Sequence, residues 1–191
     1  MKILLVGVSC VGKTTIGKRL AERLDYPFFD MDAEVERFYG APIERLQKRW
    51  ASMEEFRKKS ALVLIYLTTR KCGDDFVIAL PPRGLMGPYL RVVRQLDGAT
   101  VVALKDKAES ILSRIVFYDA DSKPIEKHLT KTERRSYLQE IKAELAFFAR
   151  SYKKADVEVH VSGSHGVEEA ADAVERALGS RMRALGAWQF P

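Results

Sequence analysis

The sequence has few of the residues that form disulfide frameworks or zinc sites. It contains two cysteines, Cys10 and Cys72, and three scattered histidines, His128, His160 and His165. This composition excludes a disulfide-stapled fold and a zinc-ligand cluster. It is consistent with a reducing, cytoplasmic location.

Long apolar runs are also missing. No stretch of about 18 uninterrupted apolar residues occurs, so we expect no membrane-spanning helix. The apolar run at 3–6 is too short for the core of a signal peptide and predicts a strand instead. The net charge of +6 favours anionic partners. Because RNP-like aromatic motifs and Lys/Arg-rich tracts are absent, we expect phosphorylated small molecules rather than nucleic acid.

The remaining pattern is an alternation of strands and helices. The predicted strands are 3–6, 26–30, 76–80, 100–104 and 157–161. The predicted helices are about 13–24, 32–39, 42–50, 53–70, 86–97, 107–116, 131–154 and 166–178. This order predicts an α/β fold with a five-stranded, doubly wound parallel sheet. We expect a single domain over 1–179, a tail over 180–191, and a monomer.

One segment between the predicted elements is long and irregular. Residues 116–135 are polar and have no steady period until Thr130 and Glu133, which form a capping box before a long helix. An irregular stretch of this length is typical of a functional loop or a disordered segment. We predict a lid over about 113–131.

A glycine-rich motif follows the first predicted strand. Residues 7–15, GVSCVGKTT, match G-x-x-x-x-G-K-[ST] at Gly7, Gly12, Lys13 and Thr14. Such a loop points backbone N–H groups at a phosphate, and the next helix adds its positive N-terminus. Lys13 is expected to reach the β and γ phosphates of ATP, and the Thr14 hydroxyl is expected to bind Mg²⁺.

Three further residues complete the predicted nucleotide loop: Cys10, Val11 and Thr15. The Cys10 thiol is open to two interpretations. It is either acidified by the N-terminus of the helix, or it is a filler without a chemical role.

Two carboxylates follow the second predicted strand. In FFDMDAEVE, Asp30 and Asp32 lie at the edge where open α/β sheets bind ligands. One can hold Mg²⁺ through water, and the other can accept the proton of an acceptor hydroxyl. Alternatively, Asp32 is only the N-cap of the next helix. The chain has neither the N-K-x-D of GTPases nor an apolar strand ending in Asp-Glu, so the pattern favours a kinase.

Residues 7–36 resemble the opening of the shikimate kinases. The shared features are the phosphate loop, the pattern T-x-G-x-x-L-A-x-x-L, a short strand and D-x-D. The resemblance continues through 40–64, with G-x-x-I and E-x-x-F-R patterns, and spans about 1–178 in the order of elements. It implies a P-loop NTPase fold of the nucleoside monophosphate kinase-like, three-layer type. Its acceptor-binding helical region would be about 32–62.

The resemblance also implies roles for particular residues. Asp30 would be the magnesium-side carboxylate, and Asp32 would hold the acceptor's hydroxyls. Arg57 would pair with the acceptor's carboxylate, a role that suits the planar guanidinium. Alternatively, it is a solvated charge on its helix. Lys123 stands where the family has a catalytic lid arginine before proline, and Arg114 fits the position that stacks on adenine.

The sequence departs from the family where the acceptor would bind. The third strand ends in ALPPRG instead of three glycines, and Phe148 replaces the arginine of R-x-P-x-Y. Arg150 lies two residues on, Ser60 replaces a glutamate, and the loop 162–166 lacks the family's basic residues and proline. Two prolines cannot reproduce a glycine cradle, because proline has no N–H donor and a restricted φ.

The ALPPRG loop itself places a new cation at the end of the third strand. We predict that Arg83 and Gly84 contact the acceptor, with Arg83 replacing the missing charge or recognising a different anion. Alternatively, Arg83 is a solvent-facing loop residue.

The sequence therefore predicts an enzyme that uses ATP and Mg²⁺ to phosphorylate a small, hydroxylated, anionic acceptor, with shikimate as the leading candidate. The predicted catalytic residues are Lys13, Asp32 and Lys123. Two alternatives stay open: a nucleotide-binding pseudo-kinase or regulator, and a kinase for a different small acceptor.

Overall fold

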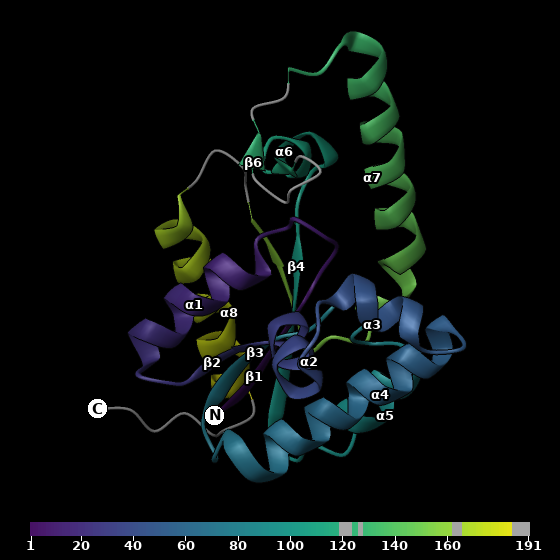
Figure 1. Cartoon of the computed structure of the whole chain (residues 1–191). Coiled ribbons are helices and arrows are strands. Elements are labelled where there is room, and N and C mark those ends of the chain that lie inside the picture. Colours follow the sequence, from purple (N-terminus) through teal and green to yellow (C-terminus); the bar gives the residue numbers. More distant parts are fainter. Residues whose placement is uncertain (119–123, 126–127, 162–165, 185–191) are drawn as a thin grey trace.

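The central sheet has five parallel strands in the order β2–β3–β1–β4–β7 (Figure 1). The computed structural model describes residues 1–118, 124–125, 128–161 and 166–184. The strands are β1 Lys2–Val6, β2 Phe28–Asp30, β3 Phe76–Ala79, β4 Ala99–Lys105 and β7 Val157–His160. This confirms the predicted doubly wound sheet. Because the strands are parallel, the segments that follow all five gather at one edge, where such folds bind ligands.

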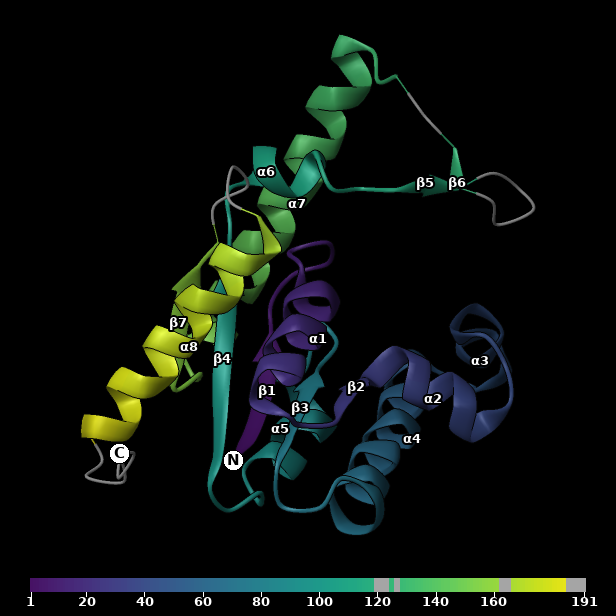
Figure 2. The same ribbon diagram turned by 90° about the vertical axis from the view of Figure 1, so that its left-hand side faces the viewer.

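Helices cover both faces of the sheet. They are α1 Lys13–Leu24, α2 Met31–Tyr39, α3 Ile43–Arg49, α4 Met53–Tyr66, α5 Gly87–Val93, α6 Ala108–Leu112, α7 Lys131–Tyr152 and α8 Val167–Ala184. Helices α1 and α8 pack together on one side, and α4, α5 and α7 lie on the other (Figure 1). Figure 2 shows α2, α3 and α4 projecting as a group beside β2, in the predicted acceptor-binding region.

The sequence pattern of the core explains this layering. The four apolar residues of β1, Ile3 to Val6, are fully buried, as expected for a strand covered on both faces. On α1, the buried residues Ile16 and Leu20 form the stripe that faces the sheet. Within the described ranges, none of the helices has the length and apolar character needed to cross a bilayer.

Helix α4 ends earlier than predicted. It was expected to reach residue 70, but it stops at Tyr66 and continues as a π-helical turn, Leu67–Lys71, in which Cys72 N–H donates to Leu67 O at 2.9 Å. The hydroxyl of Thr68 donates to Leu64 O at 2.9 Å. Such side-chain bonds compete for helical carbonyls and disturb the regular ladder.

Helix α8 extends beyond its predicted end. The tail was expected to begin at residue 180, but the helix runs to Ala184, and Arg181 forms an ion pair with Asp156 at 2.6 Å. The prediction was wrong for 180–184 because this charged pair anchors the last turn to the start of β7. Residues 185–191 lie outside the described part of the chain.

The predicted lid region contains a short hairpin that the sequence pattern did not reveal. Strand β5, Phe117–Tyr118, pairs antiparallel with β6, Pro124–Ile125. The capping box of Thr130 and Glu133 begins α7, as predicted. Lys123 lies outside the described residues, so its predicted role stays a prediction.

Candidate active site

The phosphate loop connects β1 to α1 in a conformation that depends on glycine. Gly12 has φ 107°, and a Cβ atom at Gly7 would lie 2.7 Å from Val11 Cγ1 and 2.8 Å from the Leu104 carbonyl oxygen. The Lys13 ammonium donates to Gly7 O at 3.0 Å and Val8 O at 2.9 Å. Burial lowers the pKa of Lys13, while nearby carboxylates, first Asp32 and then Asp30, oppose this shift. The loop is therefore shaped to receive an anion beside a lysine.

Cys10 occupies a left-handed position in this loop, with φ 57°. Burial raises the pKa of its thiol, and this outweighs the lowering effect of Lys13. The direction of this shift favours a filler over an acidified thiol, and the role of Cys10 stays a prediction.

Asp30 joins the end of β2 to both the phosphate loop and α2. Its Oδ2 accepts a hydrogen bond from Thr14 Oγ1 at 2.6 Å, and its Oδ1 accepts from Asp32 N–H at 3.1 Å. Asp30, rather than Asp32, is thus the N-cap of α2. The N-cap role that is the alternative for Asp32 is therefore filled by Asp30.

The Thr14–Asp30 pair suits magnesium. A hydroxyl and a carboxylate supply the oxygen ligands that Mg²⁺ prefers, and Mg²⁺ usually completes its shell with phosphate oxygens and water. Among the residues that the structure describes, no group of three or more His, Cys, Asp or Glu side chains could hold a metal. A magnesium ion here would therefore depend on the nucleotide for part of its coordination.

Asp32 faces a cavity of about 310 Å³ next to the phosphate loop. Its surroundings raise the pKa of the carboxyl, first through desolvation and then through the charge of Asp30, while Lys13 partly offsets the shift. Within the described residues its side chain has no hydrogen-bond partner. The carboxylate is thus available to a ligand in the cavity.

The cavity is lined by residues of α2, α3, α4, α5 and α7 and of the loop after β3. They are Asp32, Ile43, Gln47, Met53, Phe56, Arg57, Pro81, Pro82, Arg83, Tyr89, Glu144 and Phe148. Three of the predicted acceptor-site residues, Asp32, Arg57 and Arg83, therefore meet in one cavity although they are far apart in the sequence.

The loop after β3 is held against α7. Leu80 N–H donates to Leu5 O at 2.9 Å, and the ladder ends at Pro81, which has no N–H. The Tyr152 hydroxyl donates to Pro82 O at 3.1 Å. The guanidinium of Arg83 lies over two rings of α7, with its Cζ 5.0 Å from the centroid of Phe147 and 5.9 Å from that of Phe148. These cation–π contacts hold Arg83 at the cavity.

Gly84 does not reach the cavity. Its N–H donates to Pro81 O at 2.8 Å, and a Cβ atom on it would lie 2.6 Å from Leu80 Cβ. The structure therefore gives Gly84 a place in a tight turn, while its predicted contact with the acceptor has no support from this placement.

Arg57 and Arg83 give one part of the cavity a positive charge. Neither forms an ion pair within the described residues. Burial, followed by the charge of Arg83, lowers the pKa of Arg57. Arg150, the other candidate for the missing family arginine, is exposed and does not line the cavity. The pair of guanidinium groups is suited to an anionic ligand.

On the other side of the phosphate loop lies a smaller pocket of about 110 Å³. Its lining residues are Val11, Gly12, Thr15, Ile16, Arg114, Val161, Gly166, Val167 and Ala170. Arg114 pairs with Asp106 at 2.7 Å and donates from Nε to Cys10 O at 3.2 Å. Mostly apolar walls beside a phosphate loop suit a nucleobase; Arg114 lines this pocket, and its stacking on adenine stays a prediction.

Sequence reasoning missed two carboxylates of this site. Asp106, whose side chain is only 3% exposed, fixes Arg114, and its position directly after a strand was a usable signal. Glu144 lines the acceptor cavity and accepts a hydrogen bond from Ser9 N–H at 3.2 Å. Its spacing of four from Phe148 and eight from Tyr152, both buried, placed it on the inward face of α7.

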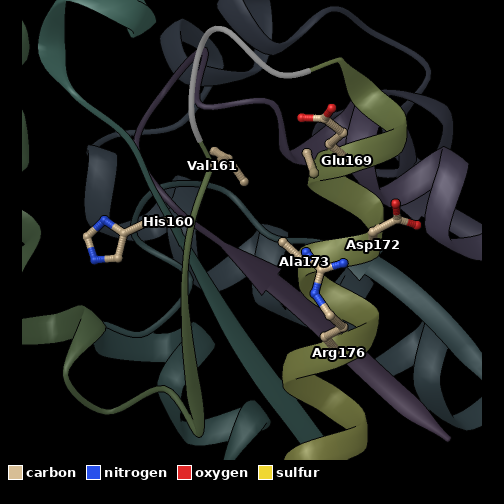
Figure 3. Close-up of a pocket in the computed structure, with 7 residues that line it drawn as sticks. His160, Val161, Glu169, Asp172, Ala173 and Arg176 are labelled. Carbon is tan, nitrogen blue, oxygen red and sulfur yellow. The ribbon is translucent and has the colours of Figure 1, made fainter.

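A separate cavity of about 430 Å³ lies between β7 and α8 (Figure 3). Figure 3 shows Asp172, Ala173 and Arg176 along α8, with His160 and Val161 at the end of β7. It is larger than the acceptor cavity but contains none of the predicted site residues. Size alone therefore does not identify the site, whereas the phosphate loop and its carboxylates do.

Comparison with known proteins identifies the family of the chain. The family model described as shikimate kinase matches residues 9–178. A shikimate kinase from Neisseria gonorrhoeae is 36% identical over 118 residues, which cover 59% of this chain and 64% of that protein. The chain spans less than two thirds of the length of the curated relatives that it matches, from 15% to 64% among the most similar ones.

Solved structures extend the similarity over the whole fold. The shikimate kinase of Aquifex aeolicus superimposes with a TM-score of 0.66 at 27% identity, covering 97% of this chain and 99% of that one. The shikimate kinase of Acinetobacter baumannii in complex with shikimate gives a TM-score of 0.70 at 27% identity, covering 97% and 93%.

Proposed function

Because the chain belongs to the shikimate kinase family, we propose that it transfers the terminal phosphoryl group of ATP to a hydroxyl of a small acceptor carrying a carboxylate. Shikimate is the leading candidate. The observation that carries this proposal is the cavity in which Asp32, Arg57 and Arg83 meet, and whose lining residue Glu144 is bonded to Ser9 of the phosphate loop. It offers a proton acceptor and an anion site to one ligand.

The nucleotide half of the proposed mechanism relies on the loop and two side chains. Lys13 would turn from its carbonyl partners to the β and γ phosphates, where its charge stabilises the transferring group. Thr14 and Asp30 would hold Mg²⁺, which neutralises charge on the phosphates when bound. Arg114, fixed by Asp106, would form one wall of the adenine pocket.

The acceptor half relies on charges at two places in the cavity. Asp32 would accept a hydrogen bond from the attacking hydroxyl and take its proton as the new oxygen–phosphorus bond forms, while the bond between the terminal phosphorus and the bridging oxygen breaks and ADP leaves. Arg57 and Arg83 would bind the carboxylate of the acceptor and so orient the hydroxyl toward the phosphate. Lys123, in the predicted lid, would stabilise the negative charge of the transferring phosphoryl group.

The alternative of a pseudo-kinase or regulator is less well supported. It would account for the replacement of the family's glycines and arginine at the predicted acceptor site. Arg83 now offers a guanidinium at the same cavity, and Asp32 is available there. The cytoplasmic location and the monomeric state stay predictions.

A coupled ADP-release assay tests the proposal. With Mg-ATP and shikimate we expect turnover that depends on shikimate, because the cavity combines a base with two guanidinium groups. A panel of small hydroxy acids, sugars and nucleosides serves as the control for acceptor identity. ATP binding without stimulation by any acceptor would favour the regulator, whereas stimulation by another hydroxy acid would reassign the acceptor.

Arg83→Gln is expected to raise KM for a carboxylate acceptor by about 10- to 100-fold, with a smaller change in kcat. Hydrogen bonds to charged groups contribute about 1.5–3 kcal/mol, which corresponds to this range. KM and kcat from initial rates give the measurement. Arg150→Gln is the matched control, because it removes the same charge from an exposed site on α7. A rise in KM for Arg150→Gln alone would transfer the role to that residue.

A further inference from the structure

Glu144 connects the phosphate loop to the acceptor cavity. It is half-buried on α7, one turn before Phe148, and its side chain lines the cavity. Its Oε1 accepts hydrogen bonds from the Ser9 N–H at 3.2 Å and the Ser9 hydroxyl at 3.3 Å. Ser9 is the third residue of the G-x-x-x-x-G-K-T motif. A carboxylate thus occupies two donors of a loop built to bind phosphate.

The position of Ser9 decides which phosphate would use these donors. Because Glu144 reaches Ser9 from the acceptor cavity, the Ser9 donors lie on the side of the loop that faces the acceptor. The phosphoryl group to be transferred has to face the acceptor as well. The terminal phosphate of a triphosphate would therefore need the donors that Glu144 holds, whereas the inner phosphates would use the N–H groups at the start of α1.

The negative charges around the phosphate loop also disfavour a terminal phosphate near Ser9. Burial lowers the pKa of Lys13, and the charges of Asp32, Asp30 and Glu144 oppose this shift, so three carboxylates already act on the single lysine of the motif. A terminal phosphate near Ser9 would meet the charge of Glu144 at close range, where like charges repel strongly. The inner phosphates, at the start of α1, would lie farther from Glu144 and would be affected less.

We propose that Glu144 is a specificity-determining residue of the nucleotide site, one that lowers the affinity for the triphosphate relative to the diphosphate by competing with the terminal phosphate for Ser9. This rests on the proposed function, since it assigns the terminal phosphate to the side that faces the acceptor. When the triphosphate binds, the Glu144 carboxylate leaves Ser9 and stays in the cavity that it already lines.

Isothermal titration calorimetry tests this without any acceptor. The ligands are Mg-ADP and the magnesium complex of a non-hydrolysable ATP analogue, and the proteins are wild type, Glu144→Gln and Glu144→Ala. We expect both variants to bind the triphosphate about tenfold more tightly than wild type, with Mg-ADP affinity changed less than about twofold. Thermal unfolding of each variant verifies that the fold is retained.

Glu140→Gln is the matched control, because it removes the same charge one turn away on the same helix. We expect it to leave both affinities unchanged. The inference is overturned if the Glu144 variants gain equal affinity for the two nucleotides, or if neither variant gains affinity for the triphosphate. In either case, nucleotide binding by the wild type still upholds the phosphate site. Absence of nucleotide binding in all proteins overturns the proposed function itself.

Discussion

Lys13→Ala is expected to abolish acceptor-dependent turnover and to weaken ATP binding by at least about 100-fold. Lys13 is the only cation of the phosphate-loop motif, and its partners in the described structure are the carbonyls of Gly7 and Val8. Both are weak competitors for a polyphosphate. Removing a preorganised group that stabilises the transferring charge typically costs about 10²–10³ in rate. Coupled turnover and calorimetric ATP affinity measure the two effects.

Two further variants separate a chemical effect from a structural one. Lys13→Met keeps most of the side-chain volume at this half-buried position, so it should lose activity as Lys13→Ala does while unfolding at a similar temperature. Lys18→Ala removes an exposed lysine from the same helix and should leave turnover unchanged. Substantial ATP turnover in Lys13→Met would show that the phosphate site has been misplaced.

Asp32→Asn is expected to lower kcat by about 10²–10⁴-fold, the usual contribution of a general base, while ATP affinity changes less than about twofold. The amide keeps the size of the side chain but cannot take the proton of an acceptor hydroxyl. ATP affinity should persist because Asp30, and not Asp32, contacts Thr14. Steady-state kcat and calorimetric affinity for Mg-ATP distinguish the two effects.

The pH profile gives a second reading of the same residue. Burial and the charge of Asp30 raise the pKa of Asp32, and the base acts only when ionised. Activity should therefore fall with decreasing pH through a pKa above the ordinary aspartate value of about 3.9. In the residual rate of Asp32→Asn, this fall in activity with decreasing pH (the acidic limb of the profile) should be absent. Glu44→Gln, at an exposed position on α3, should retain it, and a limb preserved in Asp32→Asn would assign the base elsewhere.

The nucleotide half of the site could be predicted because its determinants are local. Gly7, Gly12, Lys13 and Thr14 lie within eight residues, and the conformation of the loop follows from glycine's freedom at positive φ. The alternation of apolar strands and periodic helices likewise predicted the sheet. Asp30 and Asp32 followed from the rule that ligand-binding residues come after parallel strands.

The acceptor half could not be predicted in the same way because its determinants are distant in the chain. The loop at 81–84 receives a hydrogen bond from Tyr152, and Arg83 is held by Phe147 and Phe148. No local pattern relates a loop after the third strand to a helix more than sixty residues later. The contact of Glu144 with Ser9 has the same character, since it joins residues 135 positions apart.

By itself, the sequence determined the order of the elements, the phosphate loop, and the carboxylates that accompany it, because hydrophobic period and glycine-dependent turns act over a few residues. Only the tertiary structure decided that Asp30 caps α2, that Gly84 lies away from the cavity, and that Arg83 faces it beside Arg57. The first two depend on local hydrogen bonds whose partner the pattern does not specify, and the third depends on how α7 packs against the loop after β3. Packing of that kind is the sum of many long-range contacts, which no short pattern encodes.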